Sequence, residues 1–466
     1  MPLSMRDALA AVWEAVGGHA SELSGLRLTG RNPALPSVFP VTTAAAASVA
    51  AATLAAGGLL ADRNREPLRA VAVDALHAAV AFRSERHVRI LDRALRDLWD
   101  PLAGDYATAD GWIRLHTNYP HHRVAALQVL GVPPDRAAVT SRVAEQTAHD
   151  LESAVIAAGG VAAALRSRDE WHVHAHGARI GECPLVAIEL GEDCPAMPLP
   201  AAERPLTGVR VLDLTRVIAG PVATRFLAAH GADVLRVDPP GFDENPTVAV
   251  DGGFGKRSTL LDLRDATGRA AFERLVAAAD VIVHGYRPGA LSGLGYSTER
   301  LAALRPGLVI GRLSAYGPAG PWAPRRGFDS LVQMVTGIAD EGRRAAGVEY
   351  PVPLPCQALD HASGYLLALG VLTGLRRRHR QGGSWRIAVS LARTARWLDD
   401  LGRVAGGPDV PEPAPVSVQQ CLRVDATPWG RVEHVRCPGM IDGAPPRWER
   451  PAPRKGSGPP TFVDTA

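Results

Sequence analysis

Lysine is almost absent from this chain, and the shortage limits what the protein is expected to bind. Of 51 basic residues among 466, only Lys256 and Lys455 are lysines, so arginine carries nearly all of the positive charge. The formal net charge is +3, and so small an excess does not by itself indicate nucleic-acid binding. We therefore expect no nucleic-acid partner.

Cysteine is also scarce. The chain has five, an odd number, and none of them forms a C-x-x-C pair. This pattern argues against a disulfide framework and against a structural zinc site, and it favours a reducing, cytoplasmic compartment. The five residues are Cys183, Cys194, Cys356, Cys421 and Cys437.

Signals for secretion and membrane insertion are weak. The first twenty residues lack the basic start and apolar run of a signal peptide. A charge-free stretch at 42–61 is long enough to span a bilayer. It consists mostly of Ala, Gly and Thr, however, which contribute little to insertion. We expect this stretch to form a buried helix and expect no membrane partner.

Complete nucleotide-binding and serine-nucleophile motifs are missing as well. The segment GGFGKRST at 252–259 resembles part of a P-loop, but Val250 and Arg257 occupy positions that require Gly and Ser or Thr. No G-x-G-x-x-G follows the strand expected at 209–214, so Asp238 is weak evidence for a dinucleotide. No G-x-S-x-G is present.

The composition itself is that of a folded globular protein. Hydrophobic residues make up 46% and charged residues 21%. Proline-rich segments at 194–206 and 406–416 read as linkers. They divide the chain into a part at 1–200, a part at 205–405 and a C-terminal segment at 417–466.

The middle part alternates short apolar strands with helices. Strands are expected at 209–214, 233–237, 280–283 and 308–313, with helices at 221–229 and 268–279. This alternation predicts an α/β fold, a parallel Rossmann-like sheet flanked by helices. A second, smaller α/β domain is expected beside it.

An internal repeat relates 41–82 to 357–398. Each copy has a small-residue helix, a basic polar turn, a short strand and a further helix. Asp360 of the second copy corresponds to Ala44 of the first. The first copy therefore has no carboxylate at this position.

Three histidines at 172, 174 and 176 would share one face of a strand and could then ligate a metal. Their flanks read as a helix end and a turn, so solvated or capping histidines are the favoured interpretation, and no metal site is predicted.

The segment CQALDHASGY at 356–365 is the densest in reactive groups. The physical pattern alone favours Asp360 as a helix N-cap. The alternative is a carboxylate kept ionised at a helix N-terminus, where amide groups stabilise an oxyanion.

A series of motifs resembles the class III CoA-transferases, the CaiB–BaiF family, over about 190 residues. In family order they are PLTGVRVLDLTRVIAGP (205–221), GADVLRVDPP (231–240), GKRSTLLDLR (255–264), ADVIVHGYRPGALSGLGY (279–296), SAYGPAGPW (314–322), GFDSLVQMVTG (327–337) and LDHASGYLLALGVL (359–372).

The resemblance implies a catalytic role for Asp360. In this family an aspartate ahead of a helix attacks an acyl-CoA thioester and becomes an aspartyl-CoA thioester, from which a carboxylic acid acceptor collects CoA. The backbone N–H groups of Gly364 and its neighbours would stabilise the oxyanions. CoA and acyl-CoA enter as substrates, no cofactor is bound permanently, and the family forms homodimers.

The resemblance also implies a set of CoA-contacting residues, with arginines meeting the phosphates. They are Val217, Ile218, Ala219, Leu261, Asp262, Leu263, Arg264, Gly285, Tyr286, Arg287, Arg325 and Arg326. Lys256 belongs to the GKRS signature, and its alternative interpretation is a solvated surface lysine.

The order of the parts differs from the family pattern. Only about 75 residues follow Ser390, too few for the family's C-terminal half. Pieces similar to that half precede the core at 110–117 and 168–177. We therefore hypothesise that residues 1–200, helical plus a small domain, replace it, and that 417–466 returns to the core.

Two other functions stay open. One is an α-methylacyl-CoA racemase of the same fold, disfavoured because Phe328 stands where the racemases have the histidine of a His-Asp pair. The other is a CoA-binding protein without turnover.

Overall fold

A seven-stranded sheet forms the centre of the computed structural model, which describes residues 2–463. The strand order is β10-β9-β8-β11-β12-β13-β7, and every neighbouring pair is parallel except β13 with β7. The strands are β7 (Ala187–Leu190), β8 (Arg210–Leu214), β9 (Asp233–Asp238), β10 (Lys256–Leu260), β11 (Val281–His284), β12 (Val309–Ser314) and β13 (Trp385–Ser390).

The predicted parallel α/β sheet is confirmed, and the four strands expected in the middle part are all present. Helices accompany the sheet as predicted at 221–229 and 268–279, although both begin two residues earlier. Strand β10 was not predicted, because its residues, KRSTL, carry little apolar signal. The helices of this part are α10 (Ala219–Ala229), α11 (Pro246–Gly253), α12 (Ala266–Ala278), α13 (Thr298–Leu304), α14 (Asp329–Val335), α15 (Ile338–Ala346), α16 (Ala358–Gln381) and α17 (Leu391–Asp400).

The internal repeat is confirmed at the level of elements. The first copy folds as α2 (Val41–Asn64), β2 (Val71–Asp74) and α3 (Ala75–Ala81), and the second as α16, β13 and α17. Strand β2 has a parallel neighbour, β1 (Leu26–Thr29), and an antiparallel one, β16 (Met440–Ile441). Strand β13 is flanked in the same way by β12 and β7.

Helices α2 and α16 pack against each other in the interior. By length and composition both are able to cross a membrane, yet 94% of the most apolar window of each is buried inside the protein. The buried helix expected at 42–61 is therefore confirmed.

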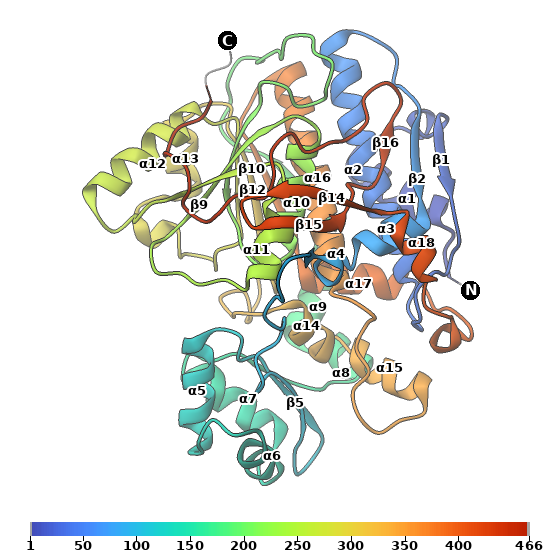
Figure 1. Cartoon of the computed structure of the whole chain (residues 1–466), viewed down its shortest axis with the longest axis vertical. Helices are drawn as coiled ribbons and strands as arrows, with labels where there is room; N and C mark the ends of the chain where they lie inside the picture. The colour runs from blue at the N-terminus through green and yellow to red at the C-terminus, as the bar shows by residue number, and fades with distance from the viewer. Residues whose placement is uncertain (1, 464–466) are drawn as a thin grey trace.

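A small domain extends from one end of the molecule, where Figure 1 shows α5, α6 and α7 below the rest of the structure. Its three strands are antiparallel, and residues such as Tyr106, Ile113 and Leu151 form a core of their own. Its elements are β4 (Gly104–Ala107), β5 (Trp112–Leu115), β6 (Ala162–Ala164), α5 (Pro120–Leu130), α6 (Arg136–Ala144) and α7 (Ala148–Ala157).

The C-terminal segment contacts both other parts of the chain. β14 (Leu422–Thr427) and β15 (Gly430–Val435) form a hairpin that pairs with β3 (Arg89–Ile90), and residues beyond β16 run beside β10. The division at 1–200, 205–405 and 417–466 into domains stays a prediction. The remaining helices are α1 (Met5–Ala15), α4 (Ser84–His87), α8 (Arg168–Val173), α9 (Ala175–Gly181), α18 (Pro415–Gln419) and the short 3₁₀ helices Ala20–Leu23, Ser292–Leu294 and Gly407–Asp409.

Candidate active site

The side chain of Asp360 lies in the first turn of α16. The helix begins at Ala358, and Gln357 occupies the N-cap position without a side-chain hydrogen bond to the helix. The interpretation of Asp360 as the N-cap is therefore wrong, because the residue is already inside the helix. Asp360 is 7% exposed, and it lines a cavity. The helix N-terminus favours its ionised form, whereas burial opposes it.

Two further buried carboxyl groups lie near Asp360. The backbone N–H of Asp360 donates to Oδ2 of Asp329 at 2.8 Å, and the amide of Gln333 donates to Oδ1 of the same residue. Oε2 of Glu85 lies 2.9 Å from Nε2 of His361. Since Glu85 belongs to α4, the N-terminal part of the chain adds a charge to this cluster.

The three carboxyl groups differ in how readily they ionise. Burial raises the pKa of Asp360 well above its usual value, and the charges of Asp329 and Glu85 raise it further. Burial also raises the pKa of Asp329, to about 6. Burial would raise the pKa of Glu85, but the hydrogen bond and charge of His361, together with a backbone hydrogen bond and the charge of Arg86, outweigh burial and lower that pKa. A carboxylate with a raised pKa is more basic, and hence a better nucleophile than an ordinary one.

A cavity of about 350 Å³ opens onto Asp360. It lies at the carboxyl ends of β8, β11 and β12, where Leu214, Gly285 and Ser314 line it. Ligands of open α/β sheets bind at this edge. Among the described residues 2–463, Asp360 is the only carboxylate that lines the cavity, and the lining includes four arginines: Arg216, Arg287, Arg325 and Arg326. The cavity therefore suits a polyanionic ligand.

The turn between β8 and α10 forms part of the cavity wall and is strained. Val217 has φ of +69°, which is rare for a β-branched residue. Its N–H donates to Oε1 of Glu244 at 2.8 Å, and Oε2 of Glu244 accepts from Arg236 at 2.7 Å. This buried ion pair holds the strained turn in place.

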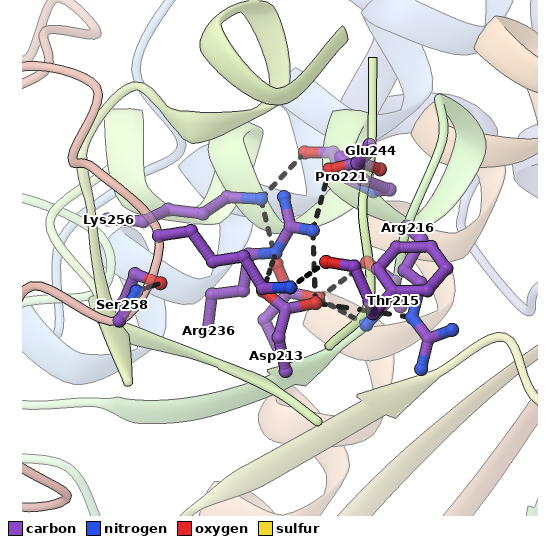
Figure 2. A network of polar contacts seen from close by, with 12 residues as sticks. Asp213, Thr215, Arg216, Pro221, Arg236, Glu244, Lys256 and Ser258 are labelled. Atoms are coloured by element: carbon purple, nitrogen blue, oxygen red, sulfur yellow. Dashed lines mark hydrogen bonds and ion pairs between the residues drawn. The ribbon is translucent and has the colours of Figure 1, made fainter. Parts of the chain in front are cut away.

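Lys256 is connected to the same turn through Asp213 (Figure 2). Its Nζ donates to Oδ2 of Asp213 at 2.8 Å and to Oγ1 of Thr224 at 2.7 Å. Oδ1 of Asp213 accepts from the N–H of Thr215 at 2.9 Å. Burial lowers the pKa of Lys256 to about 8. The alternative of a solvated surface lysine is therefore wrong, because the residue is 1% exposed and anchors the turn.

Comparison with known proteins relates this arrangement to a family. Residues 206–406 match the model described as CoA-transferase family III. The central part of the chain is thus similar to CoA-transferase family III over these residues. The matched residues include Asp360, the strained turn and six of the seven strands of the central sheet. Only β7 lies outside the match.

Several curated relatives of this chain are CoA-transferases by name. An acetyl-coenzyme A transferase of Hypoxylon pulicicidum is 30% identical over 63% of this chain and 53% of its own length. A probable fatty acyl-CoA transferase of Mycobacterium tuberculosis is 34% identical over 47% of this chain and 60% of its own. A formyl-CoA:oxalate CoA-transferase of Rhodopseudomonas palustris is 31% identical over 40% and 46%. The chain thus spans about half the length of the curated relatives that it matches.

A solved structure also matches part of the chain. The crystal structure of a hypothetical protein from Mycobacterium tuberculosis is 33% identical, with 44% of this chain and 58% of that chain covered and a TM-score of 0.38.

The structure brings most of the expected CoA-contacting residues to one cavity. Those that line it together with Asp360 are Val217, Ala219, Gly285, Tyr286, Arg287, Arg325 and Arg326. Ile218 instead lines a small pocket of about 70 Å³ that Asp360 also lines.

The other four expected residues line neither the cavity nor this small pocket. Leu261 and Leu263 pack in the hydrophobic cluster against which Tyr286 also lies. Arg264 has a side chain that is 77% exposed and pairs with Asp262 at 2.7 Å. The segment 261–264 therefore lies behind and beside the cavity wall.

Arg325 and Arg326 form hydrogen bonds with residues of the small domain. Nη2 of Arg325 donates to Oε1 of Glu152 at 2.7 Å, and Nη1 of Arg326 donates to the carbonyl oxygen of Gly159 at 2.8 Å. Arg216 and Arg287 are the other cations in the lining. The sequence interpretation missed Arg216, although it directly precedes the matched Val217.

Gly364 has a different role from the one expected of it. It lies inside α16, where its N–H is used by the helix itself, so it cannot donate to an oxyanion. A Cβ at this position would lie 2.6 Å from the carbonyl oxygen of Ala219. Glycine therefore lets the start of α10 approach α16.

The small domain supplies wall residues that sequence reasoning did not identify. Tyr119, His121 and His122 line the cavity, and the ring of His116 stacks on Phe328 with centroids 3.8 Å apart. Burial lowers the pKa of His116 to about 3, so its imidazole is neutral. The run YPHHR at 119–123 is the signal in the sequence that could have indicated them.

The histidines at 172, 174 and 176 occupy the end of α8 and the start of α9, as their flanks predicted. Nε2 of His176 lies 2.7 Å from the carbonyl oxygen of Tyr316. Within residues 2–463, no group of three or more His, Cys, Asp or Glu side chains is arranged to hold a metal ion.

Proposed function

We propose that this protein moves CoA from an acyl-CoA donor to a carboxylic acid acceptor through an aspartyl-CoA thioester at Asp360. One observation carries the proposal: a buried carboxylate with a raised pKa opens onto an arginine-lined cavity at the ligand-binding edge of the sheet. CoA transfer is also the activity that the names of the relatives share.

The first half-reaction forms the covalent intermediate. The Asp360 carboxylate attacks the thioester carbonyl, the C–S bond breaks, and CoA leaves as the thiolate. The product is a mixed anhydride of Asp360 and the acyl group. The thiolate then attacks the aspartyl carbonyl, which releases the donor acid and leaves CoA on Asp360. The acceptor carboxylate reverses these steps, so electrons and protons balance without a permanently bound cofactor.

Each tetrahedral intermediate needs donors for its oxyanion. The N–H of Asp360 already donates to Asp329. Helix α16 therefore contributes mainly the partial positive charge at its N-terminus. The first N–H groups of α10, at Ala219 and Gly220, have no carbonyl partner within their helix. Close packing at Gly364 places this end of α10 beside α16. We assign the oxyanion contacts to these amides.

The decisive experiment traps the intermediate. The full chain is incubated with acyl-CoA donors and then with hydroxylamine, and the peptide that holds Asp360 is analysed by mass spectrometry. We expect an aspartyl hydroxamate at position 360, none in Asp360→Asn, and a loss of turnover in that variant of at least about 10³-fold. Asp340→Asn is the matched control, since Asp340 is buried in the first turn of α15 outside the cavity. Normal turnover by Asp360→Asn overturns the proposal.

A racemase of the same fold is the second candidate. Phe328 cannot accept a proton, but the His116 imidazole stacked on it could. Its pKa of about 3 makes it a weak base, so transfer is favoured. Deuterium exchange at the α-carbon without a hydroxamate would support the racemase. Bound CoA without either reaction would support a non-catalytic role.

A cytoplasmic location and a homodimeric assembly are part of the same proposal. The low cysteine content supports the cytoplasmic location, and the family resemblance supports the homodimer. A mass in solution of twice the 49.2 kDa of the chain is the measurement for the dimer.

A further inference from the structure

A second opening leads toward Asp360 from the side of the small domain. It is a groove of about 720 Å³ between the loop at 96–101, helix α5 and the segment at 243–248. Nδ2 of Asn245 donates to the carbonyl oxygen of Asp97 at 2.7 Å and closes one end of it. No step proposed so far uses this groove.

The groove is continuous with the neighbourhood of the nucleophile. Trp99, His116 and Val248 line both the groove and the small pocket of about 70 Å³ that Asp360 lines. Val217 and Phe328 line the groove, the small pocket and the cavity. Val217 and Phe328 therefore form a wall between the groove and the arginine-lined cavity. Asp360 lies at the inner edge of this wall.

The charges on the two sides of this wall are opposite. The cavity has four arginines and one carboxylate, Asp360. The groove has two arginines and four carboxylates, which are Arg96, Arg123, Asp97, Asp100, Asp243 and Glu244. Its arginines already face carboxylates, Arg123 with Asp100 at 3.4 Å and Arg96 with Asp243 at 3.8 Å. Glu244 pairs with Arg236 at 2.7 Å, so the negative excess of the groove, among the residues that the structure describes, is at Asp97. A second carboxylate on a bound acyl group would meet a repulsive potential there.

Apolar side chains make up the rest of the groove. Trp99 is 38% exposed and Val124 is 53% exposed, and Leu98, Leu127 and Val248 lie among the lining residues. Surface of this kind binds an extended hydrocarbon chain and contributes free energy in proportion to the apolar area covered.

We propose that this groove binds the acyl chain, and that it selects monocarboxylic acids with an extended apolar tail over dicarboxylic acids. The inference rests on the proposed function, because it places the carboxyl carbon of the acyl group at Asp360 and the CoA moiety in the cavity. The acidic lining of the groove acts as the discriminating feature.

The test compares thioesters with six-carbon acyl groups that differ only at the far end. Hexanoyl-CoA, adipoyl-CoA and 6-aminohexanoyl-CoA are titrated calorimetrically into the full-length Asp360→Asn variant, with free CoA as the reference. We expect hexanoyl-CoA to bind at least about tenfold more tightly than adipoyl-CoA, and decanoyl-CoA more tightly still. Equal or tighter binding of adipoyl-CoA overturns the inference. So does a preference for the amino compound, since the carboxylates would then recognise a cation.

A charge added to the groove gives a second readout. Val124→Arg is expected to shift the preference toward adipoyl-CoA by about tenfold. Val173→Arg is the matched control, because Val173 is 83% exposed on α8 and does not line the groove. If the order of thioester affinities is unchanged in Val124→Arg, the acyl chain does not bind in this groove. Failure of free CoA to bind overturns the proposed function, whereas bound CoA with no ranking among the thioesters overturns only this inference.

Discussion

Asp329 is the residue through which the ionisation of Asp360 can be changed without altering the nucleophile. It accepts the backbone N–H of Asp360 at 2.8 Å, and its charge is the second cause, after burial, of the raised pKa of Asp360. A carboxyl group with a raised pKa loses its negative charge as the pH falls through that pKa. Turnover should therefore decline as the pH falls through this raised pKa, because Asp360 becomes protonated.

Asp329→Asn should shift this acidic limb to lower pH, because it removes a neighbouring negative charge. Burial and Glu85 continue to raise the pKa of Asp360, so the shift should be partial. The measurement is the pH profile of kcat/KM for the wild type and the variant. A limb that stays in place, with turnover reduced equally at every pH, would show that Asp329 only holds the backbone.

At the scale of elements, the approach of α10 to α16 determines the geometry of the site. Gly364 permits it, since a Cβ there would lie 2.6 Å from the carbonyl oxygen of Ala219 and 2.8 Å from Val222. The obstacle includes backbone, which cannot rotate away as a flexible side chain can. The two helix starts can supply oxyanion donors together only while this contact is close.

Gly364→Ala should therefore reduce kcat more than it raises KM, with a loss of stability of about 1–3 kcal/mol from overpacking. Kinetics and urea unfolding measure the two effects. Gly181→Ala is the control, because its Cβ would meet only Nη1 of Arg396 at 3.8 Å. That variant should be neutral, or more stable by up to about 1 kcal/mol. Unchanged kcat in Gly364→Ala would contradict the role given to α10.

At the scale of the whole molecule, the N-terminal part is needed to complete the core. β7 pairs with β13 at the edge of the central sheet, α2 packs along α16, and Glu85 bonds to His361 beside the nucleophile. A chain that starts at 205 would expose the apolar surface of α16, which is buried along most of its length.

We expect residues 205–466 expressed alone to aggregate, because the apolar surface exposed on α16 lacks its partner. Co-expression with residues 1–204 should recover folded protein, since the two pieces make their contacts non-covalently. Yield of non-aggregated protein and circular dichroism measure both outcomes. A cooperative thermal transition in the isolated 205–466 piece would show that the core folds without the N-terminal part.

Local pattern was enough to predict the strands β8, β9, β11 and β12, each a short apolar run bounded by turn residues, and the helices α10 and α12. The repeat of α2, β2 and α3 in α16, β13 and α17 was also readable, because both copies keep the same element order. Strand β10 was missed because its residues, KRSTL, carry little apolar signal. The position of Asp360 inside the helix was missed because helix starts depend on backbone contacts as well as on capping residues.

The sequence by itself determined the parallel α/β core and the presence of Asp360 where the other copy of the repeat has Ala44, because strand and helix periodicity and motif order are local properties of the chain. Only the tertiary structure decided that Lys256 is a buried anchor, that Arg325 holds Glu152, and that α4 and the small domain meet the core around Asp360. Each of these facts depends on residues far apart in the chain. Burial and ion pairing arise only when folding brings such residues together.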